Sequence, residues 1–271
     1  MDEEQKYLFD LFGFIVMRDV LTQEQILKLR STIRGGTEQF PPVPQSEGPL
    51  HWDVIWRDLL DLPVVSELLE CLIGNPNLLK ARKEKYEVPL PTFRLDHINV
   101  HTHVQKGFEG GRLHGGWNGT AGLYRYDNGV MYNGLTTVSF ELFDTKPNNG
   151  GFACIPGSHK ANLQLPENWR DLSTGVNACI ERVSAKPGDA IIFTEALTHG
   201  TLPWEVDEKR TTVFYKFSPH ALTWSADFFN PDDFVGYEDM DLSLIHISEP
   251  TRRTPISDAV LGLKKKRGGG G

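Results

Sequence analysis

The spacing at which apolar residues recur along the sequence changes near residue 93, and this change constrains the fold more than any other feature. Before it, apolar residues recur at helical spacing: Thr22 opens a capping box with Gln25, and a second amphipathic stretch covers residues 64–73. After it, short segments of alternating polarity are separated by turn clusters, which predicts strands at residues 93–104, 120–126, 135–143, 151–155, 179–183, 190–194 and 211–217. Helices followed by many short strands predict a mainly β protein with flanking helices, arranged as a jelly roll.

The composition argues against several classes of protein. The chain has no run of about 18 apolar residues, so we expect no membrane span, and its start lacks the apolar core of a signal peptide. The cysteines Cys71, Cys154 and Cys179 are far apart and odd in number, which predicts free thiols in a reducing, cytoplasmic setting. With 36 Asp and Glu against 28 Lys and Arg the net charge is −8, which argues against nucleic acid as a partner.

The end of the chain differs in character from the rest. Residues 242–252 (LSLIHISEPTR) resemble the translation of a sequencing adapter, and the basic run 264–267 with the closing glycines resembles homopolymer read-through. We therefore predict one domain over residues 1–241 and a non-native, disordered tail over residues 242–271. The competing interpretation is a genuine basic tail with a flexible end.

His199 and Arg210 flank residues 202–209, a segment with the character of a hairpin connection. Antiparallel pairing about its centre would set Thr201 opposite Arg210 and His199 opposite Thr212, and cross-strand partners share a face. One wall would then present an imidazole, a hydroxyl and a guanidinium, and the planar guanidinium suits a carboxylate. The alternative for Arg210 is an ion pair with an acidic residue of the connection.

His114 follows a glycine-rich lead-in at residues 106–113. A lone histidine is more often a hydrogen-bonded structural residue than a ligand, and this chain has nine histidines. His101 and His103 point to one face of the same predicted strand and form an alternative metal pair, although no third ligand is evident for them. Spacing alone therefore does not select His114.

Several segments of the chain form one pattern: residues 9–20, the Leu-His-Gly-Gly run at 113–116, the turn at 149–151 leading to 155–160, residues 187–190, and then His199, Thr201 and Arg210. Together they resemble the phytanoyl-CoA dioxygenase family of iron(II)/2-oxoglutarate oxygenases, from about residue 9 to about residue 219. Residues 150–160 are the most specific of these. The fold of the family is the double-stranded β-helix, a cupin-like jelly roll, which agrees with the strand prediction.

The resemblance assigns roles to individual residues. The two metal histidines of the family fall on His114 and His199, the arginine that binds the co-substrate falls on Arg210, and a small hydroxyl residue falls on Thr201. The resemblance thereby implies Fe(II) as the metal, 2-oxoglutarate and molecular oxygen as co-substrates, and His114, His199 and Arg210 as catalytic residues. His159 is not a ligand in the family, and a structural role in a tight turn is expected for its segment.

One position departs from the family pattern. The family motif is His-any-Asp, which completes a face of two imidazoles and one carboxylate on iron, whereas this chain has Gly116 at the third place. Four explanations compete. A chloride occupies the vacant place, as in related halogenases; another carboxylate substitutes, either Glu141 from an apolar strand or Glu195; two histidines with 2-oxoglutarate and water suffice; or the metal site is lost.

The joint presence of both histidines, Thr201 and Arg210 favours an active oxygenase over a decayed site. We predict a 2-oxoglutarate-dependent oxygenase that hydroxylates a small or medium organic metabolite. A halogenase using the Gly116 position and a non-catalytic jelly roll that binds a small molecule are the alternatives. A cupin-type metal enzyme is a further one, and it does not require Arg210 to face the metal.

Overall fold

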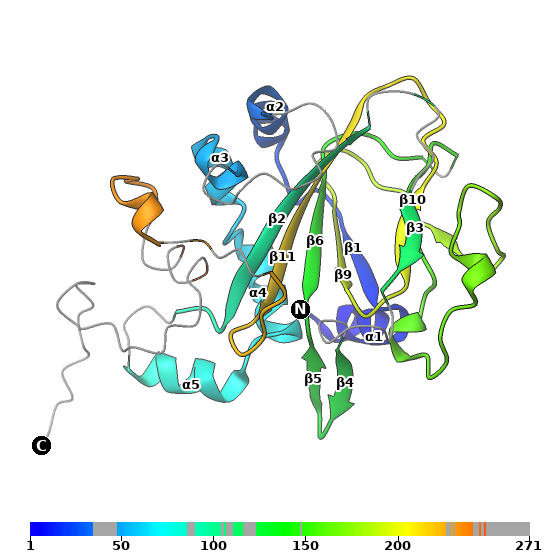
Figure 1. Ribbon diagram of the computed structural model, residues 1–271. Coiled ribbons are helices and arrows are strands. Elements are labelled where there is room, and N and C mark those ends of the chain that lie inside the picture. The colour runs from blue at the N-terminus through cyan, green and yellow to red at the C-terminus, as the bar shows by residue number, and fades with distance from the viewer. Residues whose placement is uncertain are drawn as a thin grey trace, which may run out of the picture.

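Two antiparallel sheets form the body of the molecule (Figure 1). The larger has the strand order β1-β9-β6-β11-β2, the smaller the order β3-β10-β7-β8, and β4 pairs with β5 in a separate hairpin. The strands are β1 Phe14–Met17, β2 Phe93–His103, β3 Gly111–His114, β4 Tyr124–Asp127, β5 Val130–Asn133, β6 Thr136–Glu141, β7 Gly151–Cys154, β8 Glu181–Arg182, β9 Ala190–Thr194, β10 His199–Leu202 and β11 Arg210–Pro219. This computed structural model describes residues 1–34, 48–85, 90–103, 106, 111–115, 123–146, 148–225, 229, 231–240, 244 and 247.

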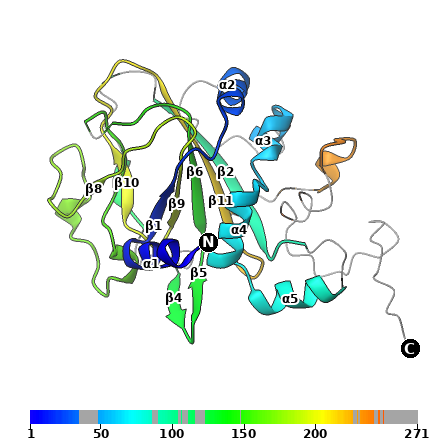
Figure 2. The same ribbon diagram turned by 180° about the vertical axis from the view of Figure 1, so that it is seen from behind.

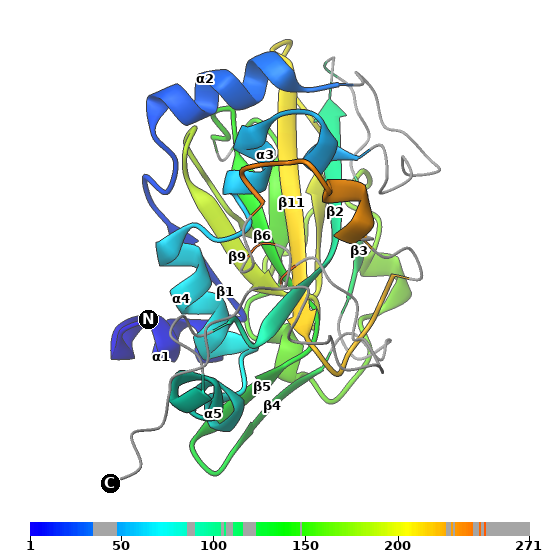
Figure 3. The same ribbon diagram turned by 90° about the vertical axis from the view of Figure 1, so that its left-hand side faces the viewer.

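The helices between residues 23 and 72 cover the outer face of the larger sheet (Figures 2 and 3). The predicted capping box is present: the Thr22 side chain accepts from the Gln25 N–H, and the Gln25 side chain accepts from the Thr22 N–H. The second predicted helix begins one residue earlier than expected, with Pro63 in its first turn. The helices are α1 Glu3–Phe12, α2 Gln23–Thr32, α3 Val54–Asp58, α4 Pro63–Leu72 and α5 Pro76–Lys85.

The two faces of the larger sheet differ in chemistry. On β11, Val213, Tyr215 and Phe217 belong to the main apolar core under the helices, and the Tyr215 hydroxyl donates to the Trp56 carbonyl oxygen at 2.6 Å. Because side chains alternate along a strand, Arg210, Thr212, Phe214 and Lys216 point to the opposite face, toward the smaller sheet. A sheet face this polar inside a jelly roll indicates a site rather than a core.

A second apolar cluster fills part of the space between the sheets. It joins Phe152 and Cys154 of β7 to Ile191 and Phe193 of β9. The jelly-roll prediction is confirmed by this arrangement of two facing antiparallel sheets with helices on one side.

The connection between β10 and β11 corrects the hairpin prediction, which was wrong. β10 pairs with β3 and β7 in the smaller sheet, whereas β11 pairs with β2 and β6 in the larger one. The Trp204 side chain is buried in the connection and its indole N–H donates to the Glu208 carbonyl oxygen at 2.8 Å. The chain therefore crosses from one sheet to the other, and Thr201 is opposite Phe152 rather than Arg210.

Two residues of the predicted tail are within the described part of the chain. Leu244 and Ile247 are buried and belong to the main apolar core, and the other residues of 242–271 lie outside the described residues. The domain boundary at residue 241 stays a prediction. Within the described residues, no helix combines the length and the hydropathy needed to cross a bilayer.

Candidate functional site

His114 and His199 are directly opposite each other in the smaller sheet. His114 ends β3, His199 begins β10, and the two are registered as antiparallel partners. Their ring centroids lie 4.3 Å apart, with the ring planes inclined at 56°. The pair that the sequence selected through the resemblance therefore converges on one place between the sheets.

Backbone carbonyls fix how each imidazole presents its nitrogens. Nδ1 of His114 lies 2.9 Å from the Arg112 carbonyl oxygen, and Nδ1 of His199 lies 2.7 Å from that of Leu197. A carbonyl oxygen only accepts, so in the neutral form of either ring Nδ1 is the nitrogen that carries the proton. Nε2 of each ring then holds the lone pair, which is the arrangement found in metal-ligating histidines.

Glu195 completes a group of three with the two histidines. It follows β9 in the turn before β10, and its Oε2 lies 3.7 Å from Nε2 of His199. One ligand atom from each of the three residues lies within 4.8 Å of the other two. Two ligand atoms that each lie about 2.1 Å from one ion are at most about 4.2 Å apart. A small rotation of the exposed His114 side chain would bring its ligand atom within that distance of the other two.

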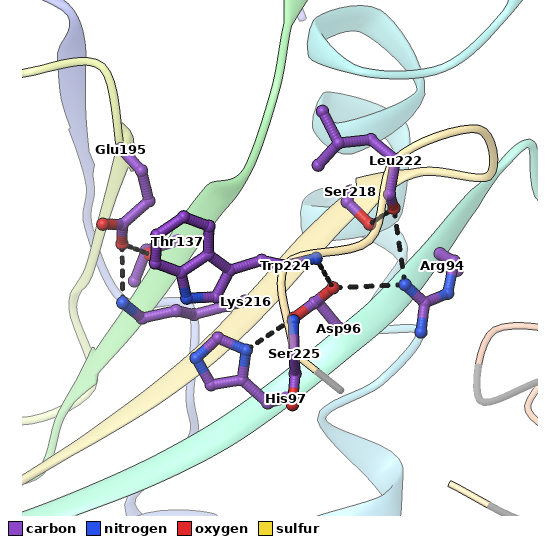
Figure 4. A network of polar contacts seen from close by, with 10 residues as sticks. All are labelled: Arg94, Asp96, His97, Thr137, Glu195, Lys216, Ser218, Leu222, Trp224 and Ser225. Atoms are coloured by element: carbon purple, nitrogen blue, oxygen red, sulfur yellow. Dashed lines mark hydrogen bonds and ion pairs between the residues drawn. The ribbon is translucent and has the colours of Figure 1, made fainter. Parts of the chain in front are cut away.

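The other oxygen of Glu195 is held by two donors. Nζ of Lys216 lies 2.8 Å from Oε1, and the Thr137 hydroxyl also donates to Oε1 (Figure 4). Burial raises the pKa of the Glu195 carboxyl, but the Lys216 ammonium and then His199 outweigh burial and hold the pKa far below its usual range. The carboxylate is therefore ionised, and its Oε2 is directed at His199.

His199 is neutral at physiological pH. Burial lowers the pKa of its imidazole to about 4, and nearby Glu195 only partly opposes that effect. The rings of Phe152 and Phe193 pack against it, with centroid distances of 5.9 and 4.7 Å. A neutral imidazole in apolar surroundings has the protonation state that metal ligation requires.

Gly115 allows the chain to pass close to this group. Its φ is +87°, and a Cβ there would run into the Leu197 carbonyl oxygen and lie 2.9 Å from that of Glu195. Only a residue without a side chain fits this backbone and this space.

Replacing Gly115 with alanine should lower the affinity for a divalent metal by about tenfold, because strain of about 1–3 kcal/mol would displace His114 or the Glu195 turn. Metal affinity measured by calorimetry tests this result. Gly129→Ala is the matched control, since Gly129 also has a positive φ but a Cβ there meets nothing within 4 Å. Equal affinity in the Gly115→Ala variant and the wild type would contradict the prediction.

Arg210 lies deep between the sheets, but it is already engaged by an acidic residue. Its Nη2 is 3.1 Å from Oε2 of Glu141, and both side chains are buried. The carboxylate of Glu141 thus contacts the arginine, while the carboxylate that joins the histidines is that of Glu195. Of the two substitute ligands considered from the sequence, the structure brings Glu195 and not Glu141 to the imidazoles.

The remaining predicted residues fall in different places. Gly116, the proposed halide position, lies outside the described residues. His101 packs its ring against Phe214 with a centroid distance of 5.2 Å and is not part of the three-residue group. Thr201 is on β10, two residues beyond His199. His159 is buried in a 3-10 turn, where Nε2 donates to the Asp10 carbonyl oxygen at 3.1 Å, as expected for a structural residue.

Lys216 and Thr137, the two residues that hold Glu195, were not predicted as site residues from the sequence. A signal for Lys216 was available, because a lysine four residues after Thr212 in a strand shares its face with Arg210 and Thr212. Thr137 carries no such signal, because a threonine is common on any strand.

The family model described as phytanoyl-CoA dioxygenase (PhyH) matches residues 9–211. A search of the curated proteins found no match.

Among solved structures, the chain is similar to HygX from Streptomyces hygroscopicus with nickel and 2-oxoglutarate bound. The identity is 21%, the TM-score is 0.67, and the match covers 84% of this chain and 90% of that chain. HygX with iron bound matches at 20% identity and a TM-score of 0.64 over the same shares. AviO1 from Streptomyces viridochromogenes Tue57 matches at 18% identity and a TM-score of 0.55, covering 82% of this chain and 96% of that one. These likenesses show a shared fold.

Proposed function

The chain belongs to the phytanoyl-CoA dioxygenase family, and from that premise we propose that it uses Fe(II) and 2-oxoglutarate to hydroxylate a small or medium organic molecule. The metal would be held by His114, His199 and Glu195, and the co-substrate by Arg210. The observation that carries this proposal is the proximity of two Nδ1-anchored imidazoles and one ionised carboxylate, whose ligand atoms lie within 4.8 Å of one another.

The donor set fits ferrous iron. Two histidines and one carboxylate on one side of the ion leave its other positions open, which is the arrangement of non-haem Fe(II) oxygenases. In this chain the carboxylate would come from the turn before β10 instead of the residue two after His114. The Lys216 ammonium and the Thr137 hydroxyl hold one oxygen of Glu195 and thereby orient the other.

The surroundings of Arg210 fit the far carboxylate of a dicarboxylate. Arg210 is 2% exposed, and its Nε has no hydrogen-bond partner among the described residues. The buried hydroxyl of Thr145 is likewise without a partner there. Both side chains lie beside Gly151, where an added Cβ would meet Thr145 and would be 3.7 Å from the Arg210 guanidinium. Buried donors of this kind normally bind something, and a ligand carboxylate would satisfy them.

The protein residues would position and shield the reaction. Bound iron with 2-oxoglutarate supplies the oxidising power for hydroxylation of an unactivated carbon. The Arg112 and Leu197 carbonyls fix the two rings, and Phe152 and Phe193 exclude water from one side of His199. Arg210 would fix the far end of the co-substrate, so that its reacting end meets the metal in one orientation.

The position of Glu195 favours hydroxylation over the halogenase alternative. A halide requires a metal position that no protein carboxylate fills, and Glu195, whose Oε2 lies 3.7 Å from Nε2 of His199, would fill such a position. A small-molecule substrate agrees with HygX, which has been solved with hygromycin B bound.

Replacing Arg210 with alanine should weaken binding of 2-oxoglutarate by on the order of 100-fold, because the variant removes the cation from a buried charge-paired site. The measurement is an anaerobic titration of the Fe(II)-loaded protein with 2-oxoglutarate, followed by the weak visible charge-transfer band. Arg125→Ala, at an exposed position on β4, is the control and should titrate as the wild type does. A wild-type protein that binds Fe(II) but develops no band at saturating 2-oxoglutarate would refute the proposed function.

A further inference from the structure

Glu141 occupies Nη2, one of the donors that Arg210 could offer to a co-substrate carboxylate. Its side chain is fully buried, and both of its oxygens lie near Nη2 of Arg210, Oε2 at 3.1 Å and Oε1 at 3.4 Å. The Ser139 hydroxyl donates to Oε1 at 2.9 Å, and the Thr212 hydroxyl is 3.5 Å from Oε2. These hydroxyls, one on β6 and one on β11, hold the carboxylate in place.

The ion pair neutralises Arg210 without using up its hydrogen bonds. A guanidinium has five N–H donors in a fork that can take a carboxylate in a bidentate manner. Glu141 contacts a single nitrogen, Nη2, and Nε is left without a partner among the described residues. An incoming carboxylate could therefore still bind through Nε, but it would face the negative charge of the buried Glu141.

The nearby Lys216 ammonium does not compensate for that charge. It lies 2.8 Å from Oε1 of Glu195 and is therefore engaged at the metal group. On the inner face of the larger sheet, each of these two cations is thus matched by a carboxylate, Arg210 by Glu141 and Lys216 by Glu195. A dianion such as 2-oxoglutarate would enter a site whose anchoring cation is already balanced.

We propose that the Glu141 carboxylate competes with the dicarboxylate co-substrate for Arg210. This competition weakens co-substrate binding and thereby sets the affinity of the protein for the co-substrate. This inference rests on the proposed function, because it takes Arg210 as the co-substrate anchor. Removing the charge of Glu141 while keeping its shape should strengthen co-substrate binding. A purely structural role for the ion pair predicts the opposite, since a less well held Arg210 would bind a carboxylate more weakly.

The test is the dissociation constant of 2-oxoglutarate for Glu141→Gln and the wild type, both loaded with Mn(II) in place of iron and titrated in a calorimeter. A glutamine keeps an oxygen that can accept from Ser139 or Arg210, and we expect at least tenfold tighter binding. Glu141→Met, an apolar side chain of similar length, should also bind more tightly. Glu181→Gln, at an exposed position on β8, is the control and should match the wild type.

The outcomes separate the two proposals. If the wild type binds 2-oxoglutarate and neither Glu141 variant binds it more tightly, the competitor role is overturned and the proposed function stands. If all the proteins bind Mn(II) and none binds 2-oxoglutarate, the proposed function fails, and the competitor role fails with it. Tighter binding by Glu141→Gln and Glu141→Met, with Glu181→Gln unchanged, supports the inference.

Discussion

Replacing Glu195 with glutamine should lower the affinity for Fe(II) or Mn(II) by more than about 100-fold. The amide oxygen of glutamine is neutral, so the variant loses the charge attraction between a carboxylate and a divalent ion. The ammonium of Lys216, which lies 2.8 Å from Oε1 of Glu195, would also keep its positive charge beside the metal with no carboxylate to balance it. Mutation of residues that merely support metal ligands already costs about 10–100-fold, and the loss of a ligand should exceed that range.

Two glutamine variants make this measurement specific. Glu181→Gln removes an exposed carboxylate of β8 and should leave metal affinity unchanged. Glu141→Gln tests the other substitute ligand, and it should also bind metal as the wild type does, because its carboxylate contacts Arg210 and not the imidazoles. If Glu195→Gln binds metal as tightly as the wild type, Glu195 has no place on the metal, and the explanation with two histidines, 2-oxoglutarate and water is favoured when Glu141→Gln is unchanged as well.

The fold could be predicted because its signals are local. The capping box at Thr22, the alternation along β2 and β6 and the short apolar run of β9 each follow from neighbouring residues, and each of these predicted segments has its counterpart in the structure. Strands β3 and β5 were not predicted, because four residues beside glycine-rich or turn segments carry too little alternation to detect.

The site could be predicted only in part, because its geometry depends on sheet assignment. The hairpin prediction placed His199 opposite Thr212. In the structure, the connection that contains the buried Trp204 crosses from one sheet to the other, and His199 is opposite His114 instead. The local alternation of β11 was sound, so Arg210 and Thr212 do share a face. The pattern of a sequence does not indicate which strands of a jelly roll are neighbours. The order of the strands decides whether Glu195 or Glu141 lies beside the two histidines.

Replacing Asp96 with asparagine should lower the free energy of unfolding by about 3–5 kcal/mol, the cost of breaking a buried ion pair by removing one partner. Asp96 on β2 is fully buried and accepts from four groups (Figure 4). Nη1 of Arg94 is 3.2 Å from Oδ1, and Nδ1 of His97 is 2.7 Å from Oδ2. The backbone N–H groups of Trp224 and Ser225 each donate to the carboxylate at 2.9 Å, which fastens the segment after β11 to β2.

Asparagine can replace at most one of the two acceptor oxygens of Asp96. Its amide NH₂ would face donors on the other side, and the buried Arg94 guanidinium would lose its carboxylate partner. Urea unfolding at pH 7 measures the difference in stability. Asp127→Asn, at an exposed residue of β4 whose carboxylate lies 4.0 Å from Arg125, is the control and should change stability by less than about 0.5 kcal/mol.

The pH dependence of the stability of the wild type and of Asp96→Asn shows whether the charge of Asp96 causes the difference between them. Burial raises the pKa of the Asp96 carboxyl, but hydrogen bonds from His97, Trp224 and Ser225 outweigh burial and hold the pKa below its usual value. A carboxyl whose folded-state pKa is lowered contributes stability above its unfolded pKa of about 3.9, and that contribution disappears as the pH falls through the folded value. The difference in the free energy of unfolding between the wild type and Asp96→Asn should therefore be constant from neutral pH to about pH 4 and become smaller below pH 4. A difference in stability that stays the same down to pH 2 would mean that the asparagine acts by disturbing packing, and that the charge of Asp96 does not hold the segment after β11 in place.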